Sequence, residues 1–174
     1  EILIGLVGSE MCIRDRNIPE ETMKKVELLW TKVGFVVQLS QMVEYNLANI
    51  LGFDEILKRF DDEKPLSKEI YDKAVKKANS LYKTLSKRPI GKILEQAEKV
   101  KFFTEDGLKL LSEACEKRNF VIHHLFREDL FKGYVDTQPE YYYETVEETI
   151  GMLHEINEQL VEIFKQQKQE YWML

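Results

Sequence analysis

The residues with the clearest potential for chemistry are Arg118, Asn119 and His123, which lie close together in a stretch with helical periodicity. Arginine stabilises charge that develops on phosphate oxygens. Histidine is the side chain that exchanges protons near neutral pH. Asparagine can position a phosphate, or orient a histidine four residues later on the same helix face. These residue types at this spacing indicate a site that handles a phosphodiester.

The position of Arg118 within its expected helix is unusual. The helical pattern begins near Thr104, and a step of about 100° per residue from Leu111 gives one apolar stripe. That stripe contains Ala114, Cys115, Ile122 and Leu125, and Arg118 falls in its middle. Asn119 lies at its edge, with His123 one turn further on. A guanidinium group among apolar side chains costs several kcal/mol unless it is paired or hydrated, so this is the strongest functional signal in the sequence.

Glu44 is a second misplaced charge, on the apolar arc of the first expected helix. We expect Glu44 and Arg118 to meet or to share a polar pocket. A purely structural interpretation is also open, in which a buried Arg118–Glu44 pair fixes the register of two helices and His123 is merely half-exposed.

The length and composition of the chain limit the classes of protein to which it can belong. The 174 residues suit one domain, and the net charge of −6 argues against binding nucleic acid through bulk charge. Two cysteines are too few for a disulfide framework, which favours a cytoplasmic setting. The sequence contains no apolar run of about 18 residues, the length that predicts a membrane span, so we expect no membrane partner. The sequence has no Cys/His cluster and no convincing glycine-rich phosphate loop, and we expect no metal and no cofactor.

Residues 1–16 do not resemble the rest of the chain. The run from Leu6 to Arg16 resembles a sequencing adapter translated in one frame. The competing interpretation, a strand or the tail of a signal peptide, lacks a clear basic start and cleavage site. We therefore expect residues 1–16 to be a non-native segment and residues 17–174 to form a single helical domain.

The remaining sequence predicts an all-α fold, an antiparallel bundle of four to five helices. The first helix starts near Pro19 and is expected to end at Gly52, with a short helical turn from Phe53 to Phe60. Further helices are expected from Ser67 to Leu85, from Ile90 to Val100, and from Thr104 through the central motif. A loop is expected over residues 133–139, and Pro139 opens the last helix.

Other candidate residues have simpler explanations. His124 points away from His123 and is expected at the surface or an interface, as is His154; Cys115 is a small core residue. Several basic residues could line an RNA cleft or simply face solvent: Lys87, Arg88, Lys117, Arg127 and Lys132. Tyr141, Tyr142 and Tyr143 could stack on bases, although packing is the default expectation.

The spacing Arg118-Asn119-x-x-x-His123 resembles the Arg–polar–x-x-x–His signature of the HEPN superfamily, the higher eukaryote and prokaryote nucleotide-binding domains. The flanks are similar too, with Ala114 ahead of the motif and Phe126 after it. The stretch from Gly34 to Leu47 resembles the opening helix of that superfamily. The resemblance covers most of residues 22–165.

The resemblance implies a dimeric helical bundle, in many members a metal-independent ribonuclease of toxin–antitoxin or anti-phage systems. It implies that Arg118 stabilises the phosphate, His123 transfers a proton at the ribose 2′-OH and Asn119 positions the substrate, with Glu44 as a supporting polar partner. It also implies a homodimer through the motif helix, an RNA substrate, and an antitoxin or regulatory protein as partner. Other members are inactive binding or scaffold modules, which is the alternative here. One toxin subgroup has a tyrosine where this chain has Leu125, so we do not expect control by modification of that kind.

Overall fold

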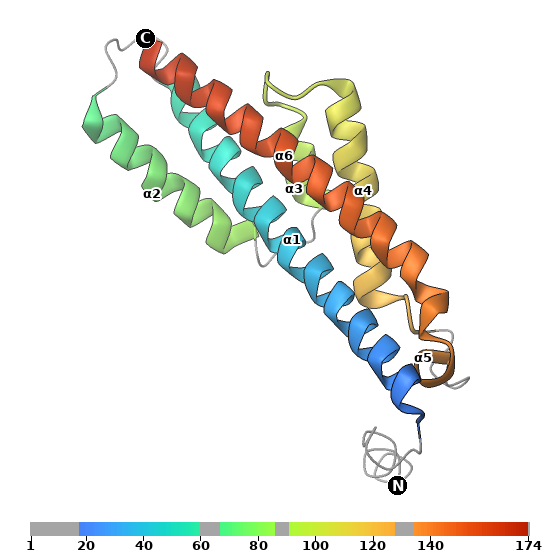
Figure 1. Cartoon of the computed structure of the whole chain (residues 1–174). Helices are drawn as coiled ribbons and strands as arrows, with labels where there is room; N and C mark the ends of the chain where they lie inside the picture. The colour runs from blue at the N-terminus through green and yellow to red at the C-terminus, as the bar shows by residue number, and fades with distance from the viewer. Residues whose placement is uncertain (1–17, 60–66, 86–90, 128–133, 174) are drawn as a thin grey trace, which may run out of the picture.

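The computed structural model describes residues 18–59, 67–85, 91–127 and 134–173, and in these ranges the secondary structure is helical, without strands (Figure 1). The predicted all-α class is confirmed. The expected non-native segment 1–16 lies outside the described residues. The elements are α1 (Glu20–Arg59), α2 (Lys68–Leu85), α3 (Gly91–Ala97), α4 (Glu105–His123), α5 (Tyr134–Thr137), the 3₁₀ helix η2 (Pro139–Tyr142) and α6 (Tyr143–Met173).

The two longest helices, α1 and α6, lie side by side and run in the same direction (Figure 1). Near their starts Lys32 pairs with Glu147 at 2.8 Å. Near their ends the side-chain amide of Gln167 donates to the carbonyl oxygen of Ile50 at 3.1 Å. The prediction of an antiparallel bundle is therefore wrong for this pair, because the intervening helices carry the chain back to the end at which α1 began.

Helix α4 runs antiparallel to both α1 and α6. Its pairing with α1 shows the direction. Arg118 contacts Glu44, while the ring of Phe126, just after α4, lies tilted against the ring of the earlier Trp30, with ring centroids 5.2 Å apart. Helix α2 lies along the other side of α1 (Figure 1). The motif helix thus packs with one side against the two long helices, on the side of the fold opposite to α2 (Figure 1).

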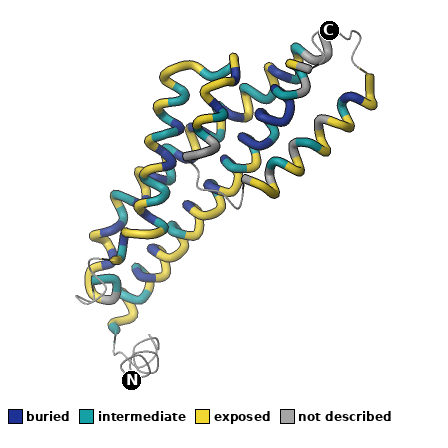
Figure 2. The backbone as a smooth tube through the Cα atoms, turned by 180° about the vertical axis from the view of Figure 1, so that it is seen from behind, coloured by how far each residue is buried: buried dark blue, intermediate teal, exposed yellow. Residues whose placement is uncertain are grey.

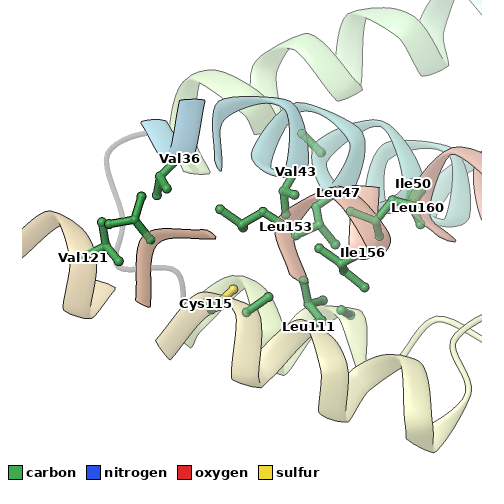
Figure 3. Packing of buried hydrophobic residues seen from close by; sticks show 14 of the residues in the cluster. Val36, Val43, Leu47, Ile50, Leu111, Cys115, Val121, Leu153, Ile156 and Leu160 are labelled. Carbon is green, nitrogen blue, oxygen red and sulfur yellow. The ribbon is translucent and has the colours of Figure 1, made fainter. Parts of the chain in front are cut away.

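Apolar side chains from α1, α4 and α6 meet in one continuous core (Figure 3). Each of these helices turns one buried stripe inward and leaves its outer face exposed (Figure 2), as expected for amphipathic helices in water. The fully buried residues of this core include Leu29, Val36, Leu47, Ile50, Leu111, Ala114, Val146, Ile156 and Leu160.

Helix α1 does not end at Gly52. It continues to Arg59, and Gly52 is buried within it. The residue after the glycine explains the continuation, because the Phe53 ring is 2% exposed and packs edge-on against the rings of Tyr71 and Phe164. Burial of an aromatic ring outweighs the roughly 1 kcal/mol helical penalty of one glycine.

The start of α4 matches the expectation. Thr104 is the N-cap, its hydroxyl oxygen accepts a hydrogen bond from the backbone N–H of Gly107 at 3.1 Å, and Glu105 and Asp106 occupy the first turn. The connection to α6 differs. The expected loop over residues 133–139 contains the short helix α5, Gly133 lies outside the described residues, and Pro139 opens a 3₁₀ turn before α6.

We predict that Thr104→Ala lowers the free energy of unfolding by about 1 kcal/mol, because the backbone N–H of Gly107 loses the hydroxyl oxygen that accepts its hydrogen bond. Urea unfolding followed by circular dichroism measures this. Thr104→Ser keeps the hydroxyl oxygen and serves as the control. Equal loss of stability in both variants would show that the cap bond does not stabilise the motif helix.

Candidate functional site

Arg118 lies between α4 and α1 and contacts the two polar side chains nearest to it. One terminal nitrogen donates to Asn119 Oδ1 at 2.8 Å, and the other lies 3.4 Å from Glu44 Oε1. The side chains of Arg118 and Glu44 are 21% and 18% exposed. The two charges predicted to meet are therefore in contact, at the long end of hydrogen-bond geometry.

Arg118 lies at the edge of the core rather than inside it. Most of the predicted stripe is buried, namely Leu111, Ala114, Cys115 and Leu125, while Ile122 is only half-buried and Val121 is buried as well. Arg118 lies in the middle of these directions on the helix, as predicted, but its side chain is 21% exposed rather than fully enclosed. The Nε atom of Arg118 is buried and has no hydrogen-bond partner in the described part of the chain. The head of the guanidinium reaches the surface while its stem is enclosed.

Glu44 is the acid most affected by this arrangement. Burial between the helices raises its pKa above the ordinary carboxyl value, and the positive charge of Arg118 offsets only part of that rise. A buried carboxylate opposite a guanidinium usually titrates lower, but the 3.4 Å separation weakens the attraction. Protonation of Glu44 in the folded state therefore removes the free-energy cost of burying its negative charge.

Cys115 faces the same polar pair from the core side. It is 2% exposed, and burial raises the pKa of its thiol to about 12, although the charge of Arg118 opposes the shift. A thiol of this kind stays protonated and unreactive at neutral pH. This fits the expectation of a small core residue.

His123 is exposed and is the last residue of α4. Five residues separate it from Arg118, which on a helix gives a rise of about 7.5 Å and a rotation of about 140°. No hydrogen bond joins Arg118 to His123 among the described contacts. The structure therefore brings Arg118, Asn119 and Glu44 together and leaves the imidazole apart, open to solvent.

A cavity of about 650 Å³ lies beside His124, not beside Arg118. His124 lies on the side of the helix away from Arg118, as the sequence predicts, but the cavity there was not predicted. The ring centroids of His123 and His124 are 6.5 Å apart, so the motif histidine lies next to one of the residues that line this cavity. Its lining consists of Phe120, His124, Leu125, Arg127, Tyr141, Tyr142, Glu144 and Thr145.

The other candidates are dispersed. Lys117 is paired with Glu148 at 2.5 Å, while Arg127 is exposed at the cavity. Tyr141 is 68% exposed and Tyr142 is 2% exposed. His154 is exposed on α6 beside Glu158. Lys87, Arg88 and Lys132 lie outside the described residues, so the expected basic rim is only partly visible.

Two further observations concern the described residues alone. They contain no group of three or more His, Cys, Asp or Glu side chains placed to hold a metal ion. None of their helices combines the length and apolarity needed to cross a membrane. Comparison with protein-family models, curated proteins and solved structures finds no match to this chain.

We predict that wild-type protein gains stability relative to Glu44→Gln as the pH falls from 7 to 4. The raised pKa means that the folded state binds a proton at Glu44 more readily than the unfolded state does. The resulting contribution of Glu44 to the free energy of unfolding is present at low pH and is lost as pH rises through the folded-state pKa. Urea unfolding at pH 7, 5 and 4 gives the difference between the two proteins. Glu95→Gln, an exposed change on α3, is the control. A difference that is constant with pH would contradict the prediction.

Proposed function

We propose that this protein is a metal-independent endoribonuclease of the HEPN type that acts as a toxin or as part of an anti-phage defence system in the cytoplasm. The observation that supports the proposal is the difference between the surroundings of Arg118 and those of His123. A partly exposed guanidinium group contacts Glu44 and Asn119, while an imidazole stands exposed at the end of the same helix. A structural ion pair accounts for the first feature but gives no reason for the second.

The proposed reaction uses groups of the protein and of RNA only. His123 removes the proton from a ribose 2′-OH, whose oxygen attacks the adjacent phosphorus. The bond from phosphorus to the 5′-oxygen breaks, and that oxygen takes up the proton from the imidazolium of His123. The products are a 2′,3′-cyclic phosphate and a 5′-hydroxyl end. Arg118 stabilises the extra negative charge on the phosphoryl oxygens, and Asn119 positions the phosphate.

The geometry of α4 bears on how the two groups act together. A rotation of about 140° directs Arg118 and His123 of one copy to different sides of the helix. The proposal therefore includes a homodimer in which the motif helices of two copies face each other across the RNA. An antitoxin or regulatory protein is the further partner, since a free ribonuclease would damage its host.

We predict that purified protein cleaves single-stranded RNA in the presence of EDTA and leaves cyclic phosphate ends. Arg118→Ala and His123→Ala are each expected to lower the cleavage rate at least about 100-fold, without loss of the helical circular dichroism signal. Denaturing gels of end-labelled RNA measure the rate and the end groups.

His124→Ala is the matched control, because it removes the neighbouring exposed imidazole from outside the motif. Full cleavage by His123→Ala would refute the assignment of the proton transfer. If the wild-type protein cleaves no RNA and is not toxic on expression, the proposed ribonuclease activity is refuted.

A binding or scaffold module of the same fold is the second candidate. It is favoured by the Arg118–Glu44 contact, which joins α4 to α1 whether or not a substrate binds. In that case Glu44→Ala destabilises the protein about as much as Arg118→Ala, since each leaves one partly buried charge without its partner. Thermal unfolding of the two variants measures this. A much smaller effect of Glu44→Ala would remove the support for this candidate.

A further inference from the structure

The cavity of about 650 Å³ lies where the end of α4 comes close to the start of α6 (Figure 1). Its lining comes from two parts of the chain. Phe120 and Arg127 belong to the end of α4 and the turn after it, while Tyr141 and Glu144 belong to η2 and the first turn of α6. Sites for small molecules usually enclose roughly 300–1,000 Å³. The cavity is therefore large enough to hold a ligand, and none of the described residues that line it belongs to the motif.

The two side chains of fixed charge in this lining, Arg127 and Glu144, have opposite sign and are both exposed. One turn further along α6, Glu148 is paired with Lys117 at 2.5 Å. By contrast, no hydrogen bond or ion pair engages the carboxylate of Glu144 among the side chains that the structure describes, and the same holds for the guanidinium of Arg127. The cavity thus offers an acceptor and a cation that the described part of the chain does not use.

Aromatic rings make up much of the remaining lining. Tyr141 is 68% exposed and Phe120 is 48% exposed. The ring of Tyr141 packs edge-on against the buried ring of Tyr142, with centroids 5.2 Å apart. Exposed rings of this kind are surfaces on which bases stack. An apolar ligand would not use the two charges, and the described residues contain no group of three side chains that could hold a metal ion.

We propose that the cavity binds one guanine nucleotide, either as an unstacked residue of single-stranded RNA or as free guanosine monophosphate. The base stacks on Tyr141 and Phe120, its Watson–Crick edge lies against Glu144, and its phosphate lies at Arg127. A nucleotide combines in one molecule the planar ring, the hydrogen-bond donors and the anion that these side chains can bind. The RNA source rests on the proposed function, whereas the site itself lies outside the motif.

The carboxylate of Glu144 selects guanine among the four bases. An ionised carboxylate only accepts hydrogen bonds. Guanine presents two adjacent donors, N1–H and the 2-amino group, which the two carboxylate oxygens accept together. Adenine and cytosine each present one amino group beside an acceptor nitrogen, and uracil presents one N–H between two carbonyl oxygens. These acceptors repel a carboxylate, so the other three bases make at most one hydrogen bond with Glu144.

This mode of binding fits the charge of the chain. A net charge of −6 argues against recognition of RNA through many phosphate contacts. A pocket that recognises one base by stacking and hydrogen bonds needs only one cation. The pocket also lies at the end of α4 that carries His123. In the proposed ribonuclease it therefore selects the nucleotide, while the motif acts on the phosphodiester.

The test is isothermal titration calorimetry of the full chain with hexanucleotides whose riboses are 2′-O-methylated, so that no cleavage can occur. One guanosine, adenosine or inosine is placed among uridines, and an all-uridine hexamer completes the set. We expect the guanosine hexamer to bind at least about tenfold more tightly than the adenosine and all-uridine hexamers. Inosine lacks the 2-amino group, so it is expected to lose most of this preference with no change to the protein.

Variants of the lining test the assignment of each side chain. Glu144→Gln is expected to abolish the preference for guanosine, because the amide replaces one acceptor with a donor. Tyr141→Ala is expected to weaken binding of every hexamer about tenfold, because one stacking surface is lost. Glu155→Gln, an exposed change further along α6, is the matched control and is expected to keep both the affinity and the preference.

Guanosine monophosphate is titrated in parallel. Binding as tight as that of the guanosine hexamer would identify the free nucleotide as the ligand, and binding of the hexamer alone would identify RNA; either result supports the site. Equal affinity for the guanosine and adenosine hexamers, no binding of either guanine ligand at 1 mM, or a guanosine preference that Glu144→Gln retains would overturn the proposal. Because these hexamers cannot be cleaved, the result is separate from the RNA cleavage assay, and failure of one does not imply failure of the other.

Discussion

The packing of α6 along α1 is the interaction on which the rest of the structure depends. Their shared core contains completely buried side chains such as Leu47, Ile156 and Leu160. Each fully buried leucine or isoleucine contributes roughly 1.5–3 kcal/mol relative to exposure. Helix α4 binds to this pair through Leu111 and Ala114, so the position of the motif follows from the contact between the two long helices.

Two residues of the motif, Arg118 and His123, have different surroundings at the boundary of this core. Arg118 is enclosed along its stem and held at its head by two polar partners, whereas His123 stands at the end of the helix with no such support. A cation held by two polar partners and an exposed imidazole suit different tasks, charge stabilisation and proton transfer.

Much of this could be predicted from sequence, because helical periodicity records which side of a helix is buried. The all-α class, the cap at Thr104 and the contact of Glu44 with Arg118 follow from patterns within single helices. The continuation of α1 past Gly52 could not be predicted, since it depends on Phe53 packing against the distant Tyr71 and Phe164. The parallel course of α1 and α6 and the cavity beside His124 likewise depend on contacts between remote segments. The roles of Arg118, Asn119 and His123 remain predictions.

The unbroken course of α1 past Gly52 divides the apolar packing into two clusters of unequal size. Among the side chains that the structure describes, Phe53 and Ile70 form the centre of a small cluster between α1 and α2, apart from the main core, against which Leu81 of α2 also packs. A small cluster gives its helix little protection against local opening. Amide hydrogen exchange in α2 should therefore outpace exchange in α4, so that one side of the bundle can detach and re-form while the motif helix stays in place.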